Sequence, residues 1–189
     1  MLDCGLPRSY WGLDESSFLQ KDDTNIWPYI RRYLRLQKNR ETVFGLYIFG
    51  GPYTGKTFVL SQILKNLLHE GFNCKYLTLE RLVDLCFAPD KDFERTINDP
   101  DYLVLDNLDL PRTRKEAFLD VPLRALRLRR DCGRPILIGS RLTMEDLGQN
   151  YGDDARMYAD QMCFPLEATG DFLRMNLERQ ELFTTAMEL

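Results

Sequence analysis

The spacing of hydrophobic residues changes near residue 43. From Asn25 to about Gln37 apolar residues recur at helical spacing, with Asn25 suited to cap the helix and Pro28 in its first turn. After a polar link at 38–42, short apolar runs alternate with longer amphipathic stretches. These runs predict five short buried strands, at 46–49, 74–79, 102–105, 136–139 and 162–166.

The stretches between the runs have the periodicity of helices with one apolar face. We expect these helices at 56–69, 80–87, 93–97, 114–130 (bent or restarted near Pro122), 143–149, 155–160 and 171–187. Strands that alternate with helices imply right-handed crossovers and a parallel sheet covered on both faces. The sequence therefore predicts an α/β fold with three layers and a five-stranded parallel sheet. Residues 1–42 would form an arm and a helix, and residues 43–189 the sheet domain, together in one compact unit.

Composition is consistent with a single soluble domain. The chain has 189 residues, of which 44% are hydrophobic and 29% charged. Its longest apolar runs are too short for a bilayer core of about 30 Å, so we expect no membrane partner. The amino terminus shows no basic leader followed by an apolar stretch, and the five cysteines are scattered, which favours a cytoplasmic location. The net charge of -4 argues against binding nucleic acid by overall charge, but a local basic face is compatible with it.

A phosphate-binding loop follows the first predicted strand. Residues 50–57 fit the pattern G-x-x-x-x-G-K-T and lie between a predicted strand and a predicted helix. Glycines allow backbone amides to approach phosphate oxygens, and the helix amino terminus adds a partial positive charge. We expect Lys56 to reach the β- and γ-phosphates and the Thr57 hydroxyl to bind Mg²⁺. The expected nucleotide contacts are Gly50, Gly51, Pro52, Tyr53, Thr54, Gly55, Lys56, Thr57 and Phe58.

The third predicted strand ends in a carboxylate. Residues 102–105 are apolar and Asp106 follows them, at the edge of the sheet where the loop should lie. We expect Asp106 to hold Mg²⁺ directly or through water. Asn107 or Asp109 would then position the attacking water.

The fourth predicted strand ends in Ser140 and Arg141. In parallel sheets ligands bind at the carboxyl ends of the strands. Both residues are therefore candidates to contact the γ-phosphate, although a solvated strand end explains them equally well.

Three classes of phosphate-loop protein compete. A small GTPase should carry an N-K-x-D motif, which we do not find, and residues 106–109 lack the glycine of its D-x-x-G motif. A nucleotide or nucleoside kinase fits the length but should have a mobile arginine-rich lid, and it is kept as an alternative. The third class is an ATPase whose third strand carries the metal carboxylate and whose fourth strand carries a sensor.

Further motifs favour the third class. They occur in order as GLPRSY at 5–10, GLYIFG at 45–50, DNL at 106–108, PILIGSR at 135–141, DL at 146–147, YG at 151–152 and GDFLR at 170–174. By these motifs the chain resembles the helicase-loader ATPases of the DnaC/DnaI type and the related IstB transposition ATPases, both of the AAA+ group. The resemblance extends from about Gly5 to Arg174.

This resemblance implies a five-stranded AAA+ core that binds ATP with Mg²⁺. It also implies ATP-dependent assembly with copies of itself, and action on single-stranded DNA with a hexameric replicative helicase or a transposition partner. Arg141 and Arg174 would contact the nucleotide of their own subunit, and Arg156 would act on a neighbouring subunit.

Three positions depart from the family pattern. Asn107 stands where the family usually has an acid that polarises the attacking water, and Arg141 stands where the sensor strand usually ends in asparagine. After the motif at 151–152 the usual second arginine position holds Asp160, which leaves Arg156. An arginine finger contributes about 10³–10⁵-fold in rate. We therefore expect ATP binding with slow turnover, and a non-hydrolysing ATP-dependent adaptor is a further alternative.

Two further features have more than one interpretation. Arg124, Arg127 and Arg130 recur at helical spacing and would either contact DNA phosphates or a neighbouring subunit, or form a solvated helix face. Tyr10 and Trp11 would pack on the domain itself, on a neighbour or on adenine.

Overall fold

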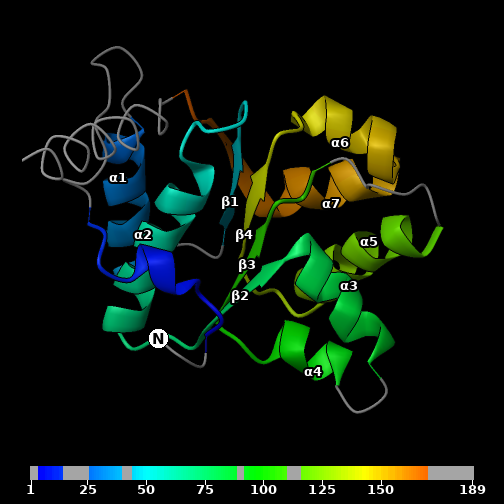
Figure 1. The fold of residues 1–189 in the computed structure, drawn as a ribbon, viewed down its shortest axis with the longest axis horizontal. Coiled ribbons are helices and arrows are strands. Elements are labelled where there is room, and N and C mark those ends of the chain that lie inside the picture. Colours follow the sequence, from blue (N-terminus) through cyan, green and yellow to red (C-terminus); the bar gives the residue numbers. More distant parts are fainter. Residues whose placement is uncertain (1–3, 15–25, 40–43, 89–91, 110–115, 170–189) are drawn as a thin grey trace, which may run out of the picture.

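A five-stranded parallel sheet forms the centre of the molecule in the computed structural model, which describes residues 4–14, 26–39, 44–88, 92–109 and 116–169 (Figure 1). The strands are β1 (Gly45–Phe49), β2 (Cys74–Thr78), β3 (Tyr102–Asp106), β4 (Ile136–Ser140) and β5 (Cys163–Glu167). Their order in the sheet is β2-β3-β4-β1-β5, and all neighbours pair in parallel. The predicted α/β class and five-stranded parallel sheet are therefore confirmed.

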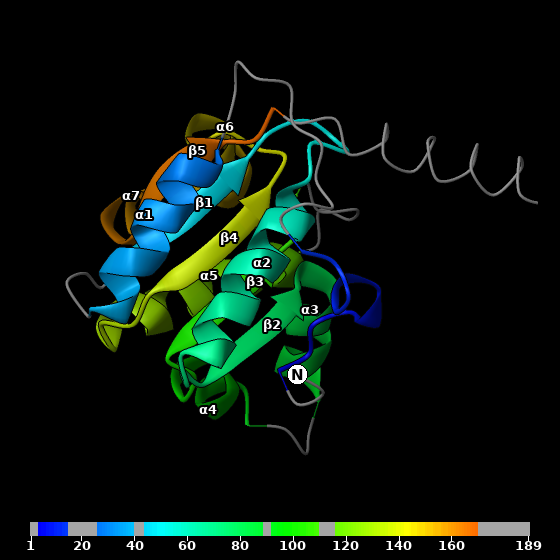
Figure 2. The ribbon, with the colours of Figure 1, turned by 90° about the vertical axis from the view of Figure 1, so that its left-hand side faces the viewer.

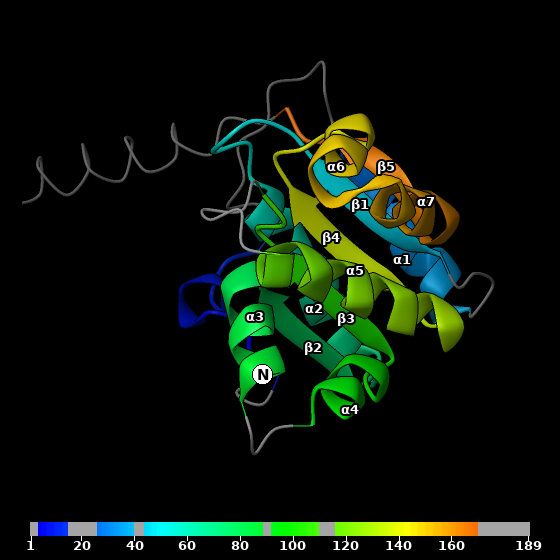
Figure 3. The ribbon, with the colours of Figure 1, turned by 90° about the vertical axis from the view of Figure 1, so that its right-hand side faces the viewer.

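Helices cover both faces of this sheet, as Figures 2 and 3 show from opposite sides. One face carries α1 (Trp27–Lys38) and α2 (Lys56–His69). The other carries α3 (Leu79–Phe87), α4 (Phe93–Asn98), α5 (Glu116–Asp131), α6 (Met144–Tyr151) and α7 (Asp153–Met162). Every residue of β3 and β4 is buried, which explains why these strands have continuous apolar runs instead of alternation.

The strand ends differ from the prediction by one residue. Asp106 and Ser140 are the last residues of β3 and β4, because the backbone ladder continues to them whatever their side chains. Leu79 was expected in the second strand but begins α3. The Thr78 hydroxyl accepts a hydrogen bond from the Arg81 amide at 3.3 Å and so caps that helix.

The helices also differ in their bounds. α5 is one helix with Pro122 inside it, so of the bend or restart expected there the restart does not occur, although proline removes one hydrogen bond from the ladder. The predicted cap at Thr143 is confirmed, since Thr143 and Asp146 form a reciprocal capping box. α7 is longer than the expected 155–160. Asn25 and the helix expected at 171–187 lie outside the described residues.

In the part of the chain that is described, no helix combines the length and apolar character needed to cross a membrane.

Arg129 of α5 is fully buried and bonds to carbonyl oxygens. Its guanidinium donates to Ile97 O at 3.0 Å, Pro100 O at 2.8 Å and Asp101 O at 2.9 Å, and also to Pro135 O. Burial lowers the pKa of this guanidinium to about 10. Arg129 thereby joins α5 to the segment between α4 and β3 and to the start of β4.

Candidate functional site

The phosphate-type loop connects β1 to α2. The chain enters α2 through Gly55, whose φ of 87° lies in the left-handed region where a side chain is strained. No side-chain hydrogen bond from the described residues caps this helix, so its first backbone amides are left for another acceptor. The partial positive charge of a helix amino terminus favours an anion at this place.

Gly50 fixes the path of the loop at its other end. A Cβ atom on Gly50 would lie 2.3 Å from the carbonyl oxygen of Ala168, which directly follows β5. The Ala168 amide donates to Phe49 O at 2.7 Å. The loop therefore leaves β1 in close contact with the chain after β5, and only glycine fits there.

The Lys56 ammonium folds back over this loop. Its Nζ donates to Gly50 O at 2.8 Å, to Gly51 O at 2.5 Å and to Thr54 Oγ1 at 3.3 Å. Burial lowers the pKa of Lys56, while the nearby carboxylates, Asp109 first, act in the opposite direction. A phosphate anion would offer this partly desolvated cation a charged partner in place of neutral carbonyl groups.

Asp106 is buried beside the loop, with 1% of its surface exposed. It lies beside the Thr57 side chain and accepts hydrogen bonds from the Tyr76 hydroxyl at 2.6 Å and from the Asn107 amide at 2.9 Å. Burial raises the pKa of Asp106, and these hydrogen bonds oppose the shift. A Cβ atom on Gly139 of β4 would lie 2.3 Å from Asp106 Oδ1, so the carboxylate fits because that position has no side chain.

The predicted metal pair is thus brought close together, because Thr57 at the start of α2 lies beside Asp106 at the end of β3. A hydroxyl and a carboxylate oxygen are ligands that suit Mg²⁺. Sequence analysis missed Tyr76 and Gly139. β2, which carries Tyr76, pairs with β3 so that Thr78 lies opposite Asp106. The sequence alone does not show which strands are neighbours in the sheet.

Asp109 and Arg141 join the ends of β3 and β4. Arg141 donates to Asp109 from Nε at 2.7 Å and from its backbone amide at 2.6 Å, so both carboxylate oxygens are engaged. The Asp109 side chain is 16% exposed and that of Arg141 is 57% exposed. Asn107 is exposed and has a left-handed φ of 59°. Of the two residues expected to position water, Asn107 is therefore the more accessible.

One predicted site residue is not brought to the nucleotide side. Ser140 is fully buried, donates to Leu108 O and accepts from the Leu142 amide at 3.0 Å. The expected γ-phosphate contact of Ser140 is corrected to a structural bond between the ends of β3 and β4.

Of the two remaining arginines, the one that the structure describes does not join this site. Arg156 is an exposed residue of α7 whose Nε lies 3.6 Å from Asp160, and it does not line the loop cavity of its own chain. Arg174 lies outside the described residues.

A cavity of about 410 Å³ unites these groups. It is lined by Lys56, Thr57, Asn107, Asp109, Arg141 and Tyr10, together with other loop residues. This volume lies within the range of about 300–1,000 Å³ that is typical of ligand sites. The start of α2, the Lys56 ammonium and the pair of Thr57 and Asp106 suit a polyphosphate that carries a metal ion. The residues present therefore fit a nucleotide with Mg²⁺.

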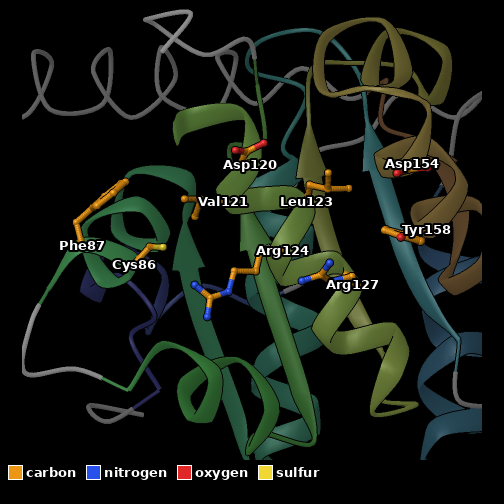
Figure 4. Close-up of a pocket in the computed structure, with 9 residues that line it drawn as sticks. All are labelled: Cys86, Phe87, Asp120, Val121, Leu123, Arg124, Arg127, Asp154 and Tyr158. Carbon is orange, nitrogen blue, oxygen red and sulfur yellow. The ribbon is translucent and has the colours of Figure 1, made fainter. Parts of the chain in front are cut away.

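A second cavity, of about 490 Å³, lies between α3, α5 and α7 and contains none of the loop residues (Figure 4). Arg124 and Arg127 of α5 line it. Arg124 pairs with Glu94 at 2.8 Å. Arg130, one turn beyond Arg127, pairs with Asp131 at 2.6 Å. Two of the three arginines of the predicted row thus have local acidic partners, which favours the solvated-face interpretation.

Comparisons with known proteins identify the fold. No protein-family model matches the chain, and no curated protein matches its sequence. A DnaC helicase loader superposes with a TM-score of 0.73 at 19% identity over 86% of this chain and 100% of the other. DnaI superposes with a TM-score of 0.69 at 21% identity over 87% and 95%. A DnaA initiator bound to AMPPCP and single-stranded DNA gives 0.63 at 16% identity over 83% and 51%. The chain therefore shares the α/β fold of these helicase-loader and DnaA structures.

Proposed function

We propose that this chain is an ATPase of the AAA+ type that couples binding of ATP and Mg²⁺ to assembly on single-stranded DNA or with a replication or transposition partner. One observation carries the proposal: a G-x-x-x-x-G-K-T loop enters, through a left-handed glycine, a helix that no described side chain caps, and its threonine lies beside a buried aspartate. The fold shared with DnaC, DnaI and DnaA structures supports it.

Each residue then has a role that its position supports. The amides at the start of α2 and the Lys56 ammonium would bind the phosphates. Thr57 and Asp106 would hold the metal ion, which would neutralise negative charge on the phosphates. Arg141, held by Asp109, would contact the γ-phosphate from the end of β4.

Hydrolysis is expected to be slow, since the described residues that line the cavity offer no free strong base. The exposed Asn107 amide can orient water but accepts a proton poorly. The Asp109 carboxylate is bound twice by Arg141. ATP would therefore stay bound long enough to stabilise an assembly, as a switch requires.

Restoring an acid at this position should speed turnover. Asn107→Glu or Asn107→Asp is expected to raise phosphate release by about 10-fold or more, because general bases contribute about 10²–10⁴-fold. The measurement is steady-state phosphate release at saturating ATP and Mg²⁺. Asn39→Glu adds the same charge at an exposed position just after α1 and should leave the rate unchanged. An unaltered rate in both Asn107 variants would refute the weak-base explanation.

Assembly tests the proposed function as a whole. Light scattering of the full chain should give a larger mass with AMPPCP and Mg²⁺ than with ADP, and single-stranded DNA should increase it further. DNA affinity should fall with salt, with a slope of about 0.7 in log K per neutralised phosphate. A nucleotide-independent mass, or ADP release that requires a nucleoside or nucleotide acceptor, would favour a phosphotransferase instead.

A further inference from the structure

The amino-terminal arm, residues 4–14, is fastened to the edge of the sheet. The Tyr76 amide of β2 donates to Cys4 O at 2.6 Å, and the Arg81 guanidinium donates to Gly5 O at 3.2 Å. Gly5 has a φ of 88°, and a Cβ atom there would lie 2.6 Å from Tyr76 O. The arm therefore begins in close contact with β2, the strand next to β3, which carries Asp106.

The arm then runs beside α2, as the dark-blue segment in Figure 2 shows. Gln62 of α2 donates to Leu13 O at 3.1 Å. Lys65, one turn further along α2, donates to Tyr10 O at 3.2 Å and also to Leu13 O. Two side chains of α2 thus hold the backbone around Tyr10. The same helix contains Lys56 and Thr57 in its first turn.

The held segment presents Tyr10 to the loop cavity. Tyr10 is half-buried and lines this cavity together with Lys56, Thr57 and Asn107. The pKa of its phenol is raised mainly by burial and, in addition, by the negative charge of Asp106. Tyr10 therefore shares the cavity with Thr57, one residue of the metal pair.

We infer that Tyr10 is a nucleotide-binding residue that donates its hydroxyl hydrogen to the γ-phosphate end of a bound nucleoside triphosphate. This inference rests on the proposed function and adds to it a residue outside the loop and strand motifs. A phenol is a neutral donor, so it binds a terminal phosphate without further like charge beside Lys56 and Arg141. A nucleoside diphosphate lacks the γ-phosphate, and the arm would thereby distinguish ATP from ADP.

The test compares two nucleotides on the full chain with Mg²⁺. Calorimetry with Tyr10→Phe should show AMPPCP binding weakened by about 10-fold or more, the loss expected for one hydrogen bond to a charged acceptor, with ADP binding unchanged. Tyr29→Phe removes a hydroxyl from an exposed residue of α1 and should change neither affinity. Lys65→Met removes two of the hydrogen bonds that hold the arm, those to Tyr10 O and Leu13 O, and should also weaken AMPPCP binding more than ADP binding.

The outcomes separate the inference from the proposed function. The inferred role of Tyr10 would be overturned if Tyr10→Phe bound AMPPCP as tightly as the wild type does, or if it lost equal affinity for AMPPCP and ADP. The proposed function would stand in both cases. Binding of neither nucleotide by the wild-type chain would overturn the proposed function itself. Thermal unfolding of each variant checks that the fold is retained, as expected for Phe, which keeps the aromatic ring.

Discussion

Replacing Lys56 with alanine is expected to abolish tight ATP binding. The ammonium sits on the loop, within 2.8 Å of Gly50 O and 2.5 Å of Gly51 O, where a phosphate held by the loop would meet it. Charge-assisted hydrogen bonds in a partly desolvated site contribute about 1.5–3 kcal/mol each, so losing the two or more that Lys56 would make corresponds to at least about 100-fold in affinity. Calorimetric titration with ATP and Mg²⁺ measures the change.

Lys38→Ala is the matched control. Lys38 pairs with Glu70 at 2.9 Å on the exposed surface of α1, so its removal should leave ATP affinity unchanged. Wild-type affinity in Lys56→Ala would place the nucleotide somewhere other than the loop.

Asp106→Asn is expected to shift activity and stability in opposite directions. The variant loses the metal-binding charge, so Mg²⁺-dependent turnover should fall by about 100-fold or more. Without nucleotide and metal, however, ionised Asp106 is a buried charge whose burial costs free energy despite its hydrogen bonds. Removing that charge should raise the midpoint of thermal unfolding.

The pH dependence has a definite sign. Because the pKa of Asp106 is raised by burial, the folded state binds its proton more tightly than the unfolded state does. The contribution of Asp106 to stability is therefore greatest at low pH and declines as the pH rises through the folded-state pKa. The advantage of Asp106→Asn should grow with pH in scans with a chelator, whereas the exposed Asp84→Asn should show none. A lower midpoint for Asp106→Asn would contradict the burial argument.

The loop and Asp106 could be predicted from sequence because their signals are local. A G-x-x-x-x-G-K-T pattern specifies its own turn and helix start, and an apolar run that ends in aspartate specifies a strand end. Ser140 and Arg141 show the limit of this reasoning. Consecutive side chains of a strand point to opposite faces, and the sequence does not decide which one meets the cavity.

Contacts between distant segments were not predictable in this way. Tyr76, Gly139 and Tyr10 reach the site because β2 and β4 flank β3 and because the arm follows α2. The burial of Arg129 was not predicted, yet Arg129 follows Val121 and Ala125 at intervals of four residues. That spacing places Arg129 on the buried face of α5, a signal available in the sequence.

A crystal structure of the full chain with AMPPCP and Mg²⁺ tests the central claim most directly. We expect the triphosphate at the amides that open α2, the Lys56 ammonium turned from the loop carbonyls to the phosphates, and the metal ion between Thr57 and Asp106. Nucleotide bound elsewhere, or an Asp106 carboxylate that contacts only Tyr76 and the Asn107 amide with no metal ion beside it, would contradict the account.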